Sequence, residues 1–207
     1  LPQHLSVTSL VELRQDPQAL ARRLARPRPT RPDLEARRGT AFHSWVQRHY
    51  GAVRLIDFED LPGDGYGEFE DAEDLAALQS AFLASEWADR TPVDIEVPFE
   101  ISVAGTAVRG RIDAVFGPDN STDGNWTVVD WKTGHEPSGT EMEAAALQLA
   151  AYRHAWAALQ NIDPARVSAV FHYVRTGRTV APAELPELPQ ATELAKLTSE
   201  ATSAPSR

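Results

Sequence analysis

The chain has 207 residues, of which 42% are hydrophobic, and a formal net charge of −10. This length is enough for one domain with a sizeable core. The sequence has no cysteine, which excludes disulfides, thiolate metal sites and iron–sulfur clusters. It also lacks the apolar run of roughly 18 residues that spans a membrane, and its N-terminus lacks the basic-then-apolar order of a signal peptide. A soluble, cytoplasmic protein without a membrane partner is therefore expected.

Positive charge gathers at the start of the chain. Residues 1–54 hold ten arginines against four acids, whereas the rest of the chain holds ten Lys and Arg against 26 acids. A basic segment of this kind can attract a phosphate backbone towards an acidic, cation-binding region. A solvated arm without a ligand explains the same charge equally well.

The first 37 residues are predicted to form a helical tether, rich in Arg and Pro, outside the catalytic core. Ser9 and Glu12 match a capping box, and a helix interrupted near Pro17 is predicted from four apolar positions. These positions are Leu10, Leu13, Leu20 and Leu24. Three prolines predict an extended linker over residues 26–38. The alternative is that the four leucines pack on the core as an integral helix.

A helix is predicted over residues 39–50, with Phe42, Trp45 and His49 along one stripe. His43 lies off this stripe and is therefore placed to face a different surface. A lone histidine on a helix is most often a surface or core residue, so His43 becomes a candidate ligand only through its partners.

The remaining elements follow from turns and from apolar periodicity. Alternating runs at 93–103 and 106–116, joined at Ala104-Gly105, predict a β-hairpin. A second capping box at Thr140 predicts the start of an Ala-rich helix. The other predictions are an acidic loop at 54–70, helices at 71–87, 141–159 and 191–197, strands at 126–132, 167–174 and 177–180, and a frayed tail at 181–207.

Three of the charged residues in the predicted strands are candidates for a functional site. Asp113 is in mid-strand, where a carboxylate is disfavoured, and an ion pair with Arg111 or Arg109 is the simplest explanation for it. Asp130 and Lys132 are two residues apart and therefore project from the same face of their strand. Taken alone, they are typical of an exposed ion pair that contributes little to stability.

The order helix, strand, strand, strand, helix, strand places Asp113 and Asp130 on neighbouring strands of one sheet. Two adjacent carboxylates repel each other unless a cation lies between them, and hard oxygen ligands suit Mg²⁺ or Mn²⁺. The imidazole of His43 would favour Mn²⁺ somewhat. Lys132 could then orient or deprotonate an attacking water and offset the charge on a phosphate.

Gln148 and Tyr152 are four residues apart and share a face of the helix predicted at 141–159. A hydrogen-bonded pair packed against the core is the simplest explanation for them.

Four segments, in this order, carry a resemblance to a known family: Arg38-Gly-Thr-Ala-Phe-His43, Gly110-Arg-Ile-Asp113, Val129-Asp-Trp-Lys-Thr-Gly134 and Gln148-Leu-Ala-Ala-Tyr152. Over residues 38–175 the chain resembles the RecB-type nuclease domain of the PD-(D/E)XK superfamily. This domain lies at the C-termini of bacterial helicase–nuclease recombination machines, including the AddA and AdnA–AdnB types. The segment Leu5–Leu10 also resembles the entry to the domain in the AdnA–AdnB type.

The resemblance implies an α/β fold with a restriction-endonuclease-like core, in which a mixed β-sheet is flanked by helices in the order αβββαβ. Residues 38–180 would form this core. The implied ligands of Mg²⁺ or Mn²⁺ are His43, Asp113, Asp130 and the main-chain carbonyl of Trp131. Lys132 would be the catalytic lysine, and Gln148 and Tyr152 would line the site next to the DNA.

The resemblance also has gaps. The chain lacks the cluster cysteines of some members and the G-x-x-x-x-G-K-[ST] motif of a helicase motor. It is expected to be either a nuclease domain cut from a longer polypeptide, which the start at Leu1 favours, or a stand-alone protein.

The expected activity is that of a metal-dependent deoxyribonuclease, an exonuclease of DNA repair and recombination. Its substrate would be single-stranded DNA delivered by a helicase motor, in cis or in a partner subunit. Two alternatives stay open. One is a catalytically inactive DNA-guiding or scaffold domain, and the other is an enzyme that acts on RNA or on structured junctions.

Overall fold

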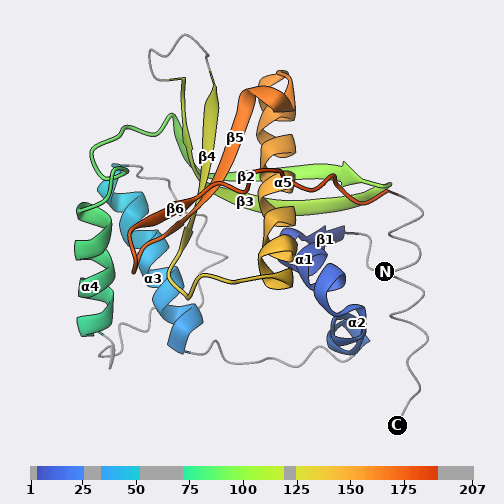
Figure 1. Ribbon diagram of the computed structural model, residues 1–207, viewed down its shortest axis with the longest axis horizontal. Coiled ribbons are helices and arrows are strands. Elements are labelled where there is room, and N and C mark those ends of the chain that lie inside the picture. Colours follow the sequence, from blue (N-terminus) through green and yellow to red (C-terminus); the bar gives the residue numbers. More distant parts are fainter. Residues whose placement is uncertain (1–3, 26–33, 52–71, 119–124, 191–207) are drawn as a thin grey trace.

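A computed structural model describes residues 4–25, 34–51, 72–118 and 125–190 (Figure 1). The helices are α1 (Val7–Gln15), α2 (Pro17–Ala25), α3 (Leu34–His49), α4 (Ala72–Leu83) and α5 (Thr140–Gln160). The strands are β1 (His4–Ser6), β2 (Asp94–Val103), β3 (Thr106–Phe116), β4 (Trp126–Lys132), β5 (Val167–Tyr173) and β6 (Arg178–Val180). The loop predicted at 54–70 and the helix predicted at 191–197 lie outside the described residues.

The strands form one mixed sheet in the order β1-β3-β4-β5-β6, with β2 paired to β3. The pairs β1–β3 and β4–β5 are parallel, whereas β2–β3, β3–β4 and β5–β6 are antiparallel. Helices cover both faces, so the molecule has three layers (Figure 1). This architecture confirms the predicted α/β fold, and the hairpin boundaries match the predicted alternation to within one residue.

Two apolar cores lie on opposite faces of the sheet. The first packs α1, α2 and α5 against the sheet and includes Leu147 and Phe171. The second packs α3 and α4 through Phe42 and Phe82. Alternate residues of a strand face opposite sides, so Val128 of β4 enters the first core and Val129 enters the second.

The N-terminal segment is part of the first core, and the prediction of a tether is wrong for residues 4–25. Leu5 of β1 pairs with Val108 of β3, and Leu10, Leu13 and Leu20 are fully buried. Of the four leucines, Leu24 is 38% exposed. The alternative therefore holds for three of the four, because Leu10, Leu13 and Leu20 bury apolar surface against the sheet and α5.

Several helix starts differ from the predicted ones. Helix α1 begins after Ser6, whose Oγ accepts a hydrogen bond from the Ser9 N–H, so the capping box predicted at Ser9 is wrong. Helix α5 follows Gly139 without a side-chain cap, which also contradicts the capping box predicted there. Helix α3 starts at Leu34, within the stretch predicted to be extended.

Gly110 of β3 lies at a close contact between the sheet and the N-terminal segment. A Cβ atom at this position would lie 2.6 Å from Phe99 Cζ and 2.8 Å from Val7 Cγ2. Gly110→Ala should therefore lower the free energy of unfolding by about 1–3 kcal/mol in a urea titration, since the packed ring has to shift. Gly134→Ala is the control, because a Cβ there would meet nothing within 4 Å. Equal stability of the two variants would contradict the close packing.

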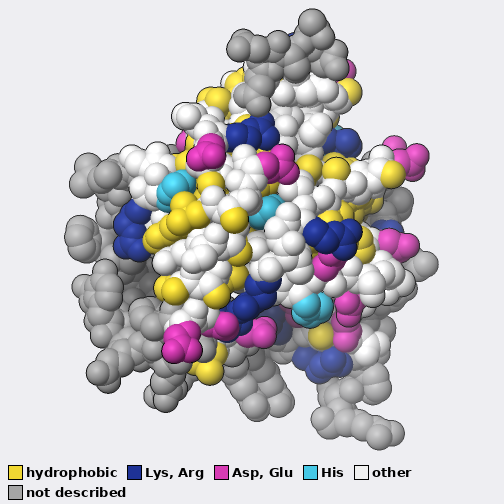
Figure 2. Space-filling model, turned by 60° about the vertical axis from the view of Figure 1, so that its left-hand side comes forward, with side chains coloured by type: hydrophobic (Ala, Val, Ile, Leu, Met, Phe, Trp, Pro, Cys, Tyr) yellow, Lys and Arg dark blue, Asp and Glu magenta, His cyan; other side chains and the backbone are white. Residues whose placement is uncertain are grey.

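Charges of both signs are interspersed on the side of the molecule that carries α3 and α4 (Figure 2). Several described arginines lie against carboxylates, as Arg38 and Arg175 do against Asp74. The described surface in this view therefore has no continuous basic track. Among the described residues, no helix is long and apolar enough to cross a membrane.

Candidate active site

The site forms where β3 and β4 separate. The last pair of this antiparallel ladder is Ala114 with Val129, so Asp113 and Asp130 occupy the next opposed positions. Instead of a further ladder bond, Asp113 Oδ2 accepts a hydrogen bond of 2.8 Å from the Trp131 N–H. The predicted meeting of the two carboxylates on neighbouring strands thus has a structural basis, because the strands open at these residues.

A third acid lies in the same row, on β2. The β2–β3 register pairs Ile95 with Ala114 and Val97 with Ile112, so Glu96 is opposite Asp113. Glu96 has a φ of 51°, which is unusual for a residue other than glycine. Such strained backbone is characteristic of functional sites.

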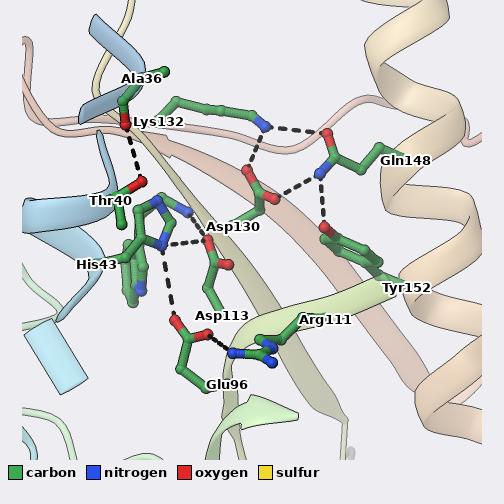
Figure 3. A network of polar contacts seen from close by, with 11 residues as sticks. Ala36, Thr40, His43, Glu96, Arg111, Asp113, Asp130, Lys132, Gln148 and Tyr152 are labelled. Atoms are coloured by element: carbon green, nitrogen blue, oxygen red, sulfur yellow. Dashed lines mark hydrogen bonds and ion pairs between the residues drawn. The ribbon is translucent and has the colours of Figure 1, made fainter. Parts of the chain in front are cut away.

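Helix α3 brings His43 to these acids. His43 Nδ1 lies 3.5 Å from Asp113 Oδ2 and 3.9 Å from Glu96 Oε1. Among the described residues, these three form a group whose ligand-capable atoms all lie within 4.8 Å of one another (Figure 3). His43 therefore faces the acids, while the neighbouring Phe42 enters the core.

Burial dominates the electrostatics of Asp113. Desolvation raises the pKa of its carboxyl to about 7, with smaller effects from its charged neighbours. His43 lowers this pKa, and Asp130 raises it. Burial and a neighbouring carboxylate thus both disfavour the ionised form of Asp113, and a bound cation would favour it.

The two arginines expected beside Asp113 have other partners. Arg109 pairs with Glu100, and Arg111 Nη1 lies 3.4 Å from Glu96 Oε2. A simple ion pair to either arginine is therefore not what holds Asp113 in mid-strand.

Asp130 belongs to a second group of contacts. Lys132 Nζ lies 2.7 Å from Asp130 Oδ2 and donates a hydrogen bond of 3.0 Å to Gln148 Oε1. Gln148 Nε2 in turn donates to Asp130 Oδ1 at 2.9 Å and to the hydroxyl oxygen of Tyr152 at 2.7 Å. The helix pair Gln148 and Tyr152 thus connects to both charged residues of β4 (Figure 3).

Tyr152 is buried, and burial raises the pKa of its phenol well above the ordinary value. The phenol is therefore neutral, and its oxygen holds the Gln148 amide in place through the hydrogen bond that it accepts. The Lys132 side chain is partly exposed, and its ammonium also lies 5.1 Å from the centre of the Phe171 ring. The Lys132 ammonium is therefore accessible from the surface, whereas Asp130 and Tyr152 are buried.

The residues present fit a divalent cation. Carboxylate oxygens and an imidazole nitrogen suit Mg²⁺ or Mn²⁺. The buried Asp130 Oδ2 makes its close ion contact with Lys132 but has no aligned hydrogen bond among the described residues. That oxygen therefore retains a lone pair for a further ligand contact.

The structure brings His43 close to Asp113, as the predicted ligand set requires. Asp130 is in the neighbouring group with Lys132, and the role of the Trp131 carbonyl stays a prediction. Sequence reasoning missed Glu96. The hairpin register would have indicated it, because Glu96 and Asp113 are equally distant from the turn at Ala104-Gly105.

The end of β4 is linked to three other segments through one hydrogen bond and two ion pairs. Arg175, which follows β5, donates a hydrogen bond to the Thr133 carbonyl at 3.0 Å and pairs with Asp74 of α4. Arg38 of α3 pairs with the same carboxylate at 2.6 Å. Helices α3 and α4 are thereby tied to the strand end that carries Lys132.

Comparison with known proteins gives one family match and two similar solved structures. Residues 4–204 match the model of the PD-(D/E)XK nuclease superfamily. A candidate exonuclease from Eubacterium rectale has a TM-score of 0.58 at 9% identity, over 97% of this chain and 76% of that chain. The crystal structure of SSO0001 gives a TM-score of 0.42 at 17% identity, over 98% and 76%. The comparison with curated protein sequences finds no significant match.

Proposed function

The chain belongs to the PD-(D/E)XK nuclease superfamily, and we propose that it is an active Mg²⁺- or Mn²⁺-dependent deoxyribonuclease. The observation that carries this proposal is the convergence of Asp113, Asp130 and Lys132 where β3 and β4 separate. His43, Asp113, Asp130 and the Trp131 carbonyl would hold the cation. When bound, the cation supplies Lewis-acid activation of the attacking water and of the phosphate.

The protein's own residues position the reacting groups. The contacts of Lys132 with Asp130 and Gln148 hold its ammonium at the mouth of the site, where it offsets negative charge on the phosphate. Gln148 also fixes the Asp130 carboxylate, and Tyr152 fixes Gln148. These hydrogen bonds and the ion pair keep Asp130 and Lys132 in a fixed orientation in the DNA-free protein.

The finer proposal is an exonuclease of a RecB-type helicase–nuclease that works on single-stranded DNA in repair and recombination. Its support is the set of four motifs, in order, at His43, Asp113, Asp130–Lys132 and Gln148–Tyr152. The mixed charges on the described part of the face in Figure 2 also favour delivery of the strand by a motor, in cis or in a partner subunit, over capture by a basic groove on that face. Such work takes place in the cytoplasm, which is the proposed location.

A catalytically inactive scaffold is the second candidate. Its weakness is physical, because burying Asp113 next to Asp130 and Glu96 disfavours the charged carboxylate and brings no gain without a cation. The predicted set of catalytic side chains is also intact.

The test uses end-labelled single-stranded DNA, double-stranded DNA and RNA with Mg²⁺, Mn²⁺ or EDTA. We expect the DNA single strand to be cut in either metal, and we expect EDTA to abolish cleavage because His43, Asp113 and Asp130 alone do not activate water. Release of mononucleotides or short products from an end would support exonuclease action. Absence of any cleavage would overturn the proposal in favour of the scaffold, and preferential cleavage of RNA would overturn the substrate assignment.

A further inference from the structure

Glu96 stands out as a carboxylate that the predicted ligand set does not include. It completes a row of three acids across β2, β3 and β4, with Asp113 in the middle and Asp130 on the other side. Like charges at opposed positions of a sheet are destabilising. The row is therefore costly unless positive charge lies against it.

Two described basic side chains, Arg111 and His43, lie beside Glu96. Its Oε2 atom faces Arg111 at 3.4 Å, and the Arg111 side chain is 62% exposed, so this pair contributes little. Its Oε1 atom points instead towards His43. The two oxygens of Glu96 thus have different neighbours, because Oε2 faces the exposed Arg111 and Oε1 faces His43 in the group with Asp113.

The spacing of this group suits one metal ion. Bonds of about 2.1 Å in an octahedral site place neighbouring ligand atoms roughly 3 Å apart and opposite ones roughly 4 Å apart. The separations of 3.5 Å from His43 Nδ1 to Asp113 Oδ2 and 3.9 Å to Glu96 Oε1 fall in this range. The Glu96 side chain is only 14% exposed, so its carboxylate is already held in place.

We infer that Glu96 is a direct ligand of the cation held by His43 and Asp113, with Oε1 bound to the metal and Oε2 kept in orientation by Arg111. This inference rests on the proposed metal dependence and adds a fourth side chain to the ligand set. The imidazole in this ligand set would favour Mn²⁺ over Mg²⁺, because nitrogen ligands suit the transition metal better.

The test measures Mn²⁺ binding to the metal-free full chain without DNA, by calorimetry and by the electron paramagnetic resonance signal of free Mn²⁺. Glu96→Gln should raise the Kd for Mn²⁺ at least about tenfold, since it removes a charged ligand. Glu100→Gln is the matched control, because Glu100 lies on the same strand and pairs with the exposed Arg109. Its Kd should stay within about twofold of the wild-type value.

The variant Arg111→Gln distinguishes two roles for Glu96, that of a metal ligand and that of an ion-pair partner of Arg111. If Glu96 binds the metal, this variant should retain a Kd within about threefold of the wild type, because only the surface contact of Oε2 is lost. If Glu96 serves only to pair with Arg111, both variants should leave the Kd for Mn²⁺ unchanged, and the inference would be overturned.

A circular dichroism melt of each metal-free variant checks the fold. Should Glu96→Gln fail to fold, Glu96→Asp keeps the charge and shortens the side chain by one methylene, and its Kd should also rise. An unchanged Kd in Glu96→Asp would overturn the inference. Cleavage by the wild type is scored separately. If Mn²⁺ binding depends on Glu96 but the wild type does not cleave DNA, the inference holds and the proposed nuclease activity is overturned. If the wild type cleaves DNA but the Glu96 variants bind Mn²⁺ as the wild type does, the proposed activity holds and the inference is overturned.

Discussion

Asp130→Asn should lower the rate of DNA cleavage by at least about 10³-fold while leaving DNA affinity within a few-fold of the wild type. Asparagine has the shape of aspartate and can keep a contact with Gln148, but it removes the charge that faces Lys132 and the proposed cation. Affinity for DNA depends mainly on contacts to phosphates, so it should survive. Single-turnover cleavage in Mn²⁺ and anisotropy of labelled DNA in Ca²⁺ measure the two effects.

The control is Asp163→Asn. Asp163 caps the short 3-10 turn at Pro164–Arg166 through a hydrogen bond from the Ala165 N–H, and asparagine caps equally well. Lys132→Ala completes the set, because it should block cleavage to a similar degree yet retain Mn²⁺ binding. Near-normal cleavage in either site variant would contradict the roles assigned to Asp130 and Lys132.

The sequence predicted the central sheet well because its signals are local. Alternation of apolar and polar residues marks β2 and β3, and the turn at Ala104-Gly105 sets their register. Helix α5 is long and rich in alanine, so its extent follows from propensity. These elements are enough to bring Asp113, Asp130 and Gln148 to one place.

What the sequence did not predict depends on contacts between distant segments. Amphipathic spacing of leucines shows that a helix buries one face, but not which surface covers it, and the prolines and arginines that follow suggested a tether. The three residues of β1 are too few for a strand pattern, and their pairing with β3 exists only in the folded chain. Glu96 was missed for a related reason, since an acid on an alternating strand is typical of a solvent-facing position.

The same contacts predict that deleting residues 1–15 should abolish cooperative unfolding. The deletion removes β1 and α1 and with them three fully buried leucines, Leu5, Leu10 and Leu13. Each buried leucine contributes about 1.5–3 kcal/mol, so the loss is roughly 5–9 kcal/mol. That is comparable with the entire stability of a typical domain, which is about 5–15 kcal/mol. The edge of β3 that pairs with β1 would also be exposed.

Two point variants test this prediction without a truncation. Leu13→Ala should lower the free energy of unfolding by about 2–5 kcal/mol in a urea titration of the metal-free protein, because Leu13 is completely buried in the first core. Leu24→Ala, on the neighbouring helix, should cost less than about 1 kcal/mol, since Leu24 is 38% exposed. The tether hypothesis would be supported if both variants were equally stable and the truncated chain still unfolded cooperatively at the wild-type midpoint. The expected contrast would instead make the segment before α3 a structural part of the nuclease domain, which any shortened version of the protein has to retain.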